Sequence, residues 1–268
     1  MTKMMALSGI NVLDLSESIG GAYCSKLLAD LGAETLLVER LETGHPLRHT
    51  GPYANDPHIE KSGLFLYYAA NKKSIVCDLE TERGGERIER LAADADVIVE
   101  GFEPGYLDSI GLGYDALSAQ NPSLVFTSIT HFGQTGPYRH WKSEEIVDYA
   151  MGGYMYFGGH AEREPLMMNN NQPMLNAGAQ AAIATLAALW WARKMGRGQR
   201  VDVSTVEAML SAHAWTSTSW THEGVVILDA RGRGNAAHRA GLHPLQGRMG
   251  VVLPVSVGAD GVRTDRSS

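Results

Sequence analysis

A turn of small residues near the N-terminus has the chemistry of an anion-binding site. The turn runs from Ser18 to Ala22, follows the apolar run Val12 to Leu15, and precedes apolar residues at helical spacing. Such a turn places unpaired backbone N–H groups at a helix N-terminus, where they attract a negative group. It lacks the G-x-G-x-x-G pattern of dinucleotide enzymes, which disfavours a nicotinamide dehydrogenase. The residues alone allow an anion site or a close-packed turn without a ligand.

Two adjacent carboxylates, Glu144 and Glu145, are of a residue type that could do acid–base or nucleophilic chemistry. A positioned carboxylate can transfer protons or act as a nucleophile. Adjacent residues of a helix point in different directions, so these two do not form a ready acid–base pair. The structural alternative is a cluster of negative charge at a helix start, stabilised by the helix dipole.

The elements that must position these residues alternate between strand and helix. This rhythm predicts an α/β fold with a doubly wound parallel sheet, whose ligands lie at the carboxyl ends of the strands. The turns at Ser18, Asp78, Gly101 and Thr130 should therefore converge. Gly32 should end the first helix in a left-handed conformation. The expected strands are Val12–Leu15, Thr35–Val38, Ile75–Leu79, Val97–Glu100, Leu124–Ile129 and Arg200–Val203.

Helical spacing predicts six helices between and after these strands. A long Gly/Pro-rich loop follows Arg40, and its length indicates a functional or partner-covered segment. From residue 231 the chain carries six Arg and no Lys, with little periodicity. The expected helices are Tyr23–Leu31, Thr81–Ala93, Tyr106–Ile110, Tyr114–Gln120, Ala179–Lys194 and Ser204–His213.

Composition narrows the functional class. The 268 residues are 44% hydrophobic and 20% charged, which is typical of a soluble globular protein. The net charge of −7 argues against a nucleic-acid surface, although local cations can still bind a small anion. No apolar run approaches a membrane span, and the N-terminus does not resemble a signal peptide. The two cysteines, Cys24 and Cys77, should be unpaired buried thiols in a reducing cytoplasm.

Several segments in a fixed order carry a family resemblance. The chain resembles the class III CoA-transferases of the CaiB/BaiF type, which include formyl-CoA and carnitine-CoA transferases. The matching segments cover nearly everything from Leu7 to about Leu210. They are LLADLGAETLLVER, NKKSIVCDLE, ADVIVEGFEPG, IGLGYDAL, NPSLVFTSITHFGQTGPY, MGGYMYFGG and LAALWWARKMGRGQRVDVSTVEAML.

The resemblance implies a Rossmann-like large domain joined to a small domain, in a dimer whose subunits interlock. Residues 7–210 would form the CoA-binding large domain, and 211–268 a linker with a partial or aberrant small-domain segment. The partners would be an acyl-CoA, a carboxylic acid and a second subunit, identical or different, with no metal. Carried over by position, the CoA contacts would be Ser18, Ile19, Gly20, Arg40, Cys77, Gly101, Phe102, Ile110 and Lys142.

The family's chemistry requires an aspartate that this chain lacks. In the family an Asp attacks the acyl-CoA, four residues before a Gly that opens a long helix. That Gly matches Gly178, so Met174 occupies the position of the Asp, and no Asp or Glu lies between Glu164 and Asp202. A thioether cannot form an acyl anhydride. Nearby, Asn176 is expected to cap the N-terminus of the helix.

Three functions therefore remain open. The first is CoA transfer between an acyl-CoA and a carboxylic acid. The second is a non-catalytic CoA-binding subunit, or the inactive half of a pair whose partner supplies the Asp. The third is racemase-like proton transfer at the acyl α-carbon by Glu145, which matches an assisting acid in relatives, or Glu144, which stands where relatives carry Tyr or His.

Overall fold

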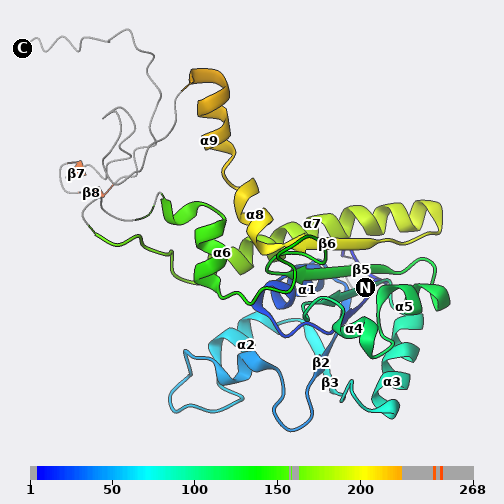
Figure 1. The fold of residues 1–268 in the computed structure, drawn as a ribbon. Coiled ribbons are helices and arrows are strands. Elements are labelled where there is room, and N and C mark those ends of the chain that lie inside the picture. Colours follow the sequence, from blue (N-terminus) through cyan, green and yellow to red (C-terminus); the bar gives the residue numbers. More distant parts are fainter. Residues whose placement is uncertain (1–4, 157, 159–162, 225–243, 246–247, 250–268) are drawn as a thin grey trace, which may run out of the picture. The chain divides into compact units, whose positions relative to one another are not determined.

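The structure is a computed structural model that describes residues 5–156, 158, 163–224, 244–245 and 248–249 (Figure 1). The chain divides into two compact units. The first comprises residues up to Tyr154 together with Met167–His213, and the second comprises Met155–Leu166 and the chain from Ala214 onward. Most of the segment after residue 224 lies outside the described residues, including nearly all of the Arg-containing stretch.

The first unit is built on a six-stranded sheet in which every neighbouring pair is parallel. The strand order is β3-β2-β1-β4-β5-β6, so the direction of winding reverses between β1 and β4. The predicted doubly wound α/β fold is confirmed, and a reversal of this kind leaves a crevice at the carboxyl ends of the two strands. The strands are β1 (Asn11–Asp14), β2 (Glu34–Glu39), β3 (Lys72–Val76), β4 (Val97–Glu100), β5 (Val125–Thr130) and β6 (Arg200–Ser204).

Helices cover both faces of the sheet (Figure 1). The helices of the first unit are α1 (Ile19–Asp30), α2 (Gly63–Tyr68), α3 (Glu82–Ala93), α4 (Tyr106–Ser109), α5 (Tyr114–Gln120), α6 (Glu145–Met151), α7 (Gln172–Met195) and α8 (Thr205–Ser211), with a 3-10 turn η1 (Pro46–His49). Val97 and Val99 of β4 pack in the core cluster on the side of α1 and α7, whereas Ile98 packs on the side of α3 and α5. Burial on both faces explains why β4 is an uninterrupted apolar run.

The second unit contains a short helix, a helical turn and two antiparallel strands of two residues each within its described residues. These elements are α9 (Ala214–Thr218), η3 (Ser219–Glu223), β7 (Pro244–Leu245) and β8 (Arg248–Met249), and η2 (Tyr154–Tyr156) lies at the boundary between units. Among the described residues, no helix combines the length and apolar character required to cross a bilayer.

A buried ion pair joins β1, β3 and α1. Lys72 Nζ lies 2.9 Å from Asp14 Oδ2 and donates to Ser25 Oγ at 2.8 Å, and its side chain is only 1% exposed. Asp14 Oδ1 accepts the backbone N–H of Ser16 at 3.0 Å, which shapes the chain as it approaches α1. The predicted third strand was wrong by three residues, because β3 begins at Lys72 and its charge is neutralised inside the protein. Gly32 does adopt the expected left-handed conformation, with φ of 101°.

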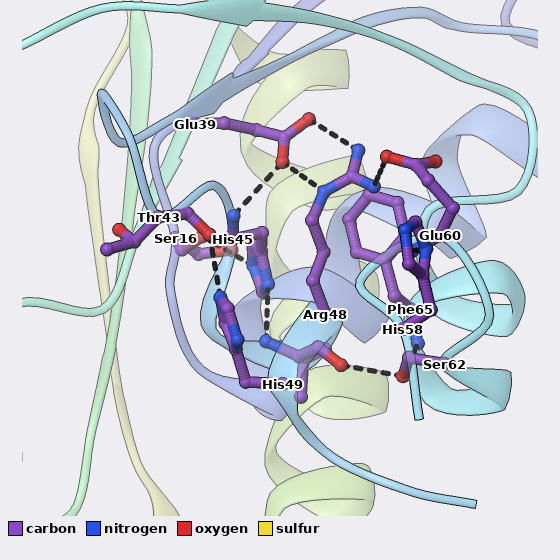
Figure 2. A network of polar contacts seen from close by, with 11 residues as sticks. Ser16, Glu39, Thr43, His45, Arg48, His49, His58, Glu60, Ser62 and Phe65 are labelled. Carbon is purple, nitrogen blue, oxygen red and sulfur yellow. Dashed lines mark hydrogen bonds and ion pairs between the residues drawn. The ribbon is translucent and has the colours of Figure 1, made fainter. Parts of the chain in front are cut away.

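The long loop after β2 is held by a polar network around Arg48 (Figure 2). Arg48 donates to both oxygens of Glu39, at 2.6 and 3.0 Å, and to Glu60 at 3.0 Å, while its guanidinium lies 3.7 Å from the centre of the Phe65 ring. His45 donates its backbone N–H to Glu39 and its ring Nε2–H to Ser16 O. The loop is thereby fixed against the turn that leads into α1.

This network predicts an acid-sensitive contribution to stability. Burial opposes ionisation of Glu39, but hydrogen bonds from Arg48 and His45 outweigh it and lower the Glu39 pKa from 4.5 to about 2. A depressed carboxyl pKa stabilises the fold above pH 4.5, and that stabilisation is lost as the pH falls toward about 2. Glu39→Gln should reduce the free energy of unfolding at pH 7 by about 3 kcal/mol and flatten its pH dependence below pH 5. Urea unfolding at several pH values measures both effects.

Glu60→Gln is the matched control, because Glu60 contacts the same guanidinium but is 66% exposed. Exposed pairs contribute about 0.5 kcal/mol, so this variant should retain the pH dependence of the original chain. Equal losses in the two variants would contradict the role given to Glu39.

Candidate functional site

Two adjoining cavities lie at the carboxyl edge of the sheet. The Met174 cavity has a volume of about 350 Å³ and is lined by residues that include Ser18, His131 and Met174. The Arg40 cavity has a volume of about 600 Å³ and is lined by Arg40 and Cys77, among others. Phe102, Glu103 and Pro104, directly after β4, line both cavities. Both volumes fall in the range of small-molecule sites, and their position matches the reversal of strand order.

Five of the residues predicted from the sequence line the Met174 cavity. They are Ser18, Gly101, Phe102, Lys142 and Glu144. Ser18 is the N-cap of α1, and its hydroxyl oxygen accepts the Gly21 N–H at 3.2 Å. Within the described residues, the backbone N–H groups of Ile19 and Gly20 have no hydrogen-bond acceptor, although neither residue lines the cavity.

The Arg40 cavity contains Arg40, Cys77 and Phe102 from the predicted set. Arg40 donates through two nitrogens to the carboxylate of Glu17, and these hydrogen bonds raise the Arg40 pKa. A phosphate group would therefore have to displace Glu17. Burial raises the pKa of the Cys77 thiol, which suits an apolar wall rather than a nucleophile. The rings of Phe102 and Tyr106 lie 5.0 Å apart and form an aromatic wall, of which the sequence indicated Phe102 but not Tyr106.

Four predicted residues do not line either cavity. Ile110 packs against the core cluster on the α3 side, and Ile19 packs against Leu37 and its neighbours. Gly20 lies beneath the cavity floor, where an added Cβ would be 3.3 Å from both the Ile129 side chain and the Met174 carbonyl. The fourth, Glu145, lies beside the Met174 cavity on α6.

The two adjacent carboxylates point in different directions, as predicted. Glu144 is the N-cap of α6, makes no side-chain capping bond, and lines the Met174 cavity. Glu145 Oε1 is buried and has no hydrogen-bond partner among the described residues. Burial, followed by repulsion from Asp148, raises the Glu145 pKa. Glu145 can therefore hold a proton, but it does not face the cavity that would contain a substrate.

Met174 lies in the first turn of α7, which begins seven residues before the predicted start. Pro173 is tolerated there because the first helical positions need no N–H donor. The expectation that Asn176 caps the helix was wrong. Asn171 is the N-cap, and Asn176 lies inside α7, where its amide donates to Ala208 O at 3.2 Å. The sulfur of Met174 lies 4.0 Å from Thr205 Oγ1.

A histidine–aspartate pair on the cavity wall was missed from the sequence. His131 lines the Met174 cavity, and its Nδ1 lies 2.7 Å from Oδ2 of the fully buried Asp148. The other oxygen of Asp148 accepts the Ser143 hydroxyl at 2.8 Å. His131 could have been found from the sequence, because it directly follows β5, where one of the converging turns was predicted. Its pairing with Asp148 on α6 could not, because no regular sequence spacing relates the two residues.

The loop from 139 to 142 brings positive charge to the cavity despite the negative net charge of the chain. Arg139 and Lys142 both line the cavity, and Arg139 donates to His140 Nε2 at 2.8 Å. Neither cation forms an ion pair with a carboxylate among the described residues. No cluster of three or more His, Cys, Asp or Glu suited to a metal ion occurs in the same part of the chain.

Comparison with known proteins identifies the family. The model of CoA-transferase family III matches residues 7–253, and the chain belongs to this family. It is 39% identical over 238 residues, 88% of its length, to the succinyl-CoA:(R)-benzylsuccinate CoA-transferase subunit BbsE of Thauera aromatica, and covers 57% of that protein. It is 38% identical to the formyl-CoA:oxalate CoA-transferase of Streptomyces avermitilis, with 79% of this chain and 50% of that protein covered. The chain thus spans about half the length of these curated relatives.

Solved structures support the same assignment. A CaiB/BaiF family protein from Brucella suis superposes with a TM-score of 0.78 at 33% identity, covering 84% of this chain and 60% of that protein. Rv3272 from Mycobacterium tuberculosis superposes with a TM-score of 0.73 at 29% identity, covering 82% of this chain and 60% of that protein. The resemblance to CaiB/BaiF proteins seen in the sequence is therefore confirmed.

The close approach of α1 and α7 beneath the cavities gives a stability prediction. A Cβ on Gly178 would lie 2.5 Å from the Gly20 carbonyl oxygen, so Gly178→Ala must separate the two helix starts. We expect a loss of about 1–3 kcal/mol in the free energy of unfolding, measured by urea titration.

Gly85→Ala is the control for the same chemical change. Gly85 lies in α3 with open space around its Cβ position, so alanine should stabilise the helix by up to about 1 kcal/mol. A stable Gly178→Ala variant would show that the helices do not pack this closely.

Proposed function

We propose that this chain belongs to a subunit of a class III CoA-transferase and binds the CoA portion of an acyl-CoA across the two cavities. The nucleotide would occupy the Arg40 cavity, and the thioester would occupy the Met174 cavity. The observation that carries the proposal is that Phe102, Glu103 and Pro104 line both cavities where the strand order reverses. The side chain of Lys142, which lines the Met174 cavity, suits a ligand with negative groups.

The reaction of the whole enzyme would move CoA between an acyl-CoA and a free carboxylic acid. Such exchange proceeds through a carboxylate nucleophile, which Met174 cannot replace. We therefore propose that a partner subunit supplies the nucleophile in an interlocked dimer. The Thauera aromatica relative is named as a subunit, and a Chloroflexus aurantiacus relative is named as the alpha subunit of succinyl-CoA–L-malate CoA-transferase. The unpaired buried thiols Cys24 and Cys77 suit a cytoplasmic location.

A second candidate function is complete CoA transfer by this chain itself, with a different nucleophile. It is supported by Glu103 and Glu144, the two carboxylates that line the Met174 cavity. α-Proton transfer by Glu145 lacks comparable support, because Glu145 does not line the cavity.

Introducing a carboxylate at position 174 distinguishes the two candidate functions by experiment. Met174→Asp would place a carboxylate in the first turn of α7, within reach of the Thr205 hydroxyl. We expect this variant to form a hydroxylamine-sensitive acyl adduct with acyl-CoA, detected by intact-protein mass spectrometry. The original chain should form none.

Glu103→Gln and Glu144→Gln serve as the matched variants. If the original chain forms an adduct that either change abolishes, the second candidate function is correct and the partner-nucleophile proposal is wrong. Met174→Leu controls for disturbance of the cavity floor and should leave CoA affinity unchanged.

Because Arg40 is paired with Glu17, removing the charge of one or of the other should have opposite effects on coenzyme A binding. Arg40→Ala should weaken binding about tenfold, or about 1.4 kcal/mol, because a charge-assisted contact is lost. Glu17→Gln should tighten binding about threefold, because Arg40 no longer has to leave a carboxylate. Isothermal titration calorimetry with coenzyme A at low salt measures both changes.

Lys73→Ala removes the same charge outside both cavities, since Lys73 is 80% exposed and pairs with Glu34. It should leave the dissociation constant within twofold. If Lys73→Ala weakens binding as much as Arg40→Ala, the effect is one of net charge, and the placement of the nucleotide is wrong.

A further inference from the structure

The His131–Asp148 pair has the geometry of an oriented base. Because Asp148 accepts at 2.7 Å, Nδ1 of His131 carries the proton, and the lone pair of the neutral ring lies on Nε2. Nε2 has no hydrogen-bond partner within the described residues, and the His131 side chain is 33% exposed on the cavity wall. The backbone is also fixed, because His131 O accepts the Val206 N–H and the Ser204 hydroxyl, both at 3.1 Å.

The burial of the Asp148 carboxylate is energetically unfavourable, which indicates that the His131–Asp148 pair has a function. Asp148 is fully buried, and burying a carboxylate is unfavourable unless all its partners are provided. Its two oxygens are bound by His131 and Ser143, so the local structure is built to hold the imidazole in one orientation. CoA exchange between ionised carboxylates transfers no proton. An oriented imidazole is therefore not required for exchange, whereas attack by water on a thioester requires a base.

A hydrogen-bond donor for the thioester lies in the same cavity. Ser18 Oγ accepts the Gly21 N–H, which leaves the hydroxyl proton of Ser18 available. Within the described residues this proton has no other acceptor. Directed into the cavity, it can stabilise negative charge on the carbonyl oxygen during attack. Met174 provides no nucleophile on this wall.

From this constellation we infer a second activity: His131 is a general base for hydrolysis of acyl-CoA thioesters in the Met174 cavity, with Asp148 as its positioning residue. The inference rests on the proposed function, because it takes the thioester to lie in that cavity. The substrate class is an acyl-CoA whose carbonyl lies between His131 and Ser18.

The step balances with water as the only co-reactant. His131 Nε2 removes one proton from water, whose oxygen bonds to the thioester carbonyl carbon. The tetrahedral intermediate collapses with cleavage of the C–S bond, and the imidazolium returns its proton to the departing sulfur. The products are a carboxylic acid, which ionises in solvent, and coenzyme A as the thiol.

The test measures thiol release from acetyl-CoA, butyryl-CoA and succinyl-CoA by the full chain, without a carboxylic acid acceptor. Each rate is corrected for uncatalysed hydrolysis. His131→Ala should lower kcat about 100-fold, the size of a general-base contribution, with acyl-CoA affinity within twofold of the original. Added imidazole should restore part of the rate in His131→Ala, which a purely structural role would not allow. Asp148→Asn should lower kcat without changing the dissociation constant.

His58→Gln is the control for loss of an imidazole, because His58 lines neither cavity and its Nδ1 accepts the Glu60 N–H at 3.1 Å. This variant should keep the original rate. Circular dichroism and CoA titration confirm that each variant is folded and binds ligand.

The outcomes distinguish the two proposals. Two results would overturn the assignment of His131 as a general base and leave the proposed function intact. They are acyl-CoA binding without hydrolysis, and hydrolysis that is unchanged in His131→Ala. Solvent deuterium at the acyl α-carbon without thiol release also overturns this assignment, because the proton then comes from carbon. Absence of any acyl-CoA binding by the folded chain overturns the proposed function itself.

Discussion

The ion pair between Lys72 and Asp14 is the interaction on which the carboxyl edge of the sheet depends. It joins an edge strand, the central strand β1 and helix α1 at one buried point. Removing one partner of such a pair leaves an uncompensated buried charge and costs about 3–5 kcal/mol. Through Asp14 the pair also fixes Ser16, and through Ser16 it connects to the loop held by Glu39 and Arg48. These contacts hold the turn after β1 and the start of α1 in place, and they thereby position Ser18 on the cavity wall.

Charge is distributed unevenly around the two cavities. The chain carries a net charge of −7, yet Arg40, Arg139 and Lys142 lie at the cavity walls. Arg40 is compensated by Glu17, whereas Lys142 has no carboxylate partner among the described residues. Local cations can thus attract an anionic ligand that the overall charge would repel. The two cavities differ chemically, because one contains the Arg40–Glu17 ion pair and Cys77, whereas the other contains hydroxyls, two histidines and Met174.

Much of the fold could be predicted because each strand and helix has a local signal. β4 and α5 were predicted to the residue, since an uninterrupted apolar run and regular helical spacing mark them. β3 was misplaced because Lys72 and Lys73 are atypical of a strand, and only the distant Asp14 makes Lys72 acceptable there. The start of α7 was misplaced because its first residues include Pro173 and Asn176, which are atypical of a helix interior. Likewise, Asn176 has the residue type of a cap, but its partner Ala208 lies 32 residues away.

The sequence by itself determined the family, the parallel sheet and the edge where its turns converge, because these depend on local patterning and on motifs in a fixed order. The family resemblance also led us to expect Met174 at the position of the family's aspartate. Only the tertiary structure decided which predicted residues share a cavity, and it left Ile110 in the core. It also paired Arg40 with Glu17 and His131 with Asp148. Such pairings depend on side-chain directions from elements distant in the chain, and no periodicity or spacing along a sequence contains that information.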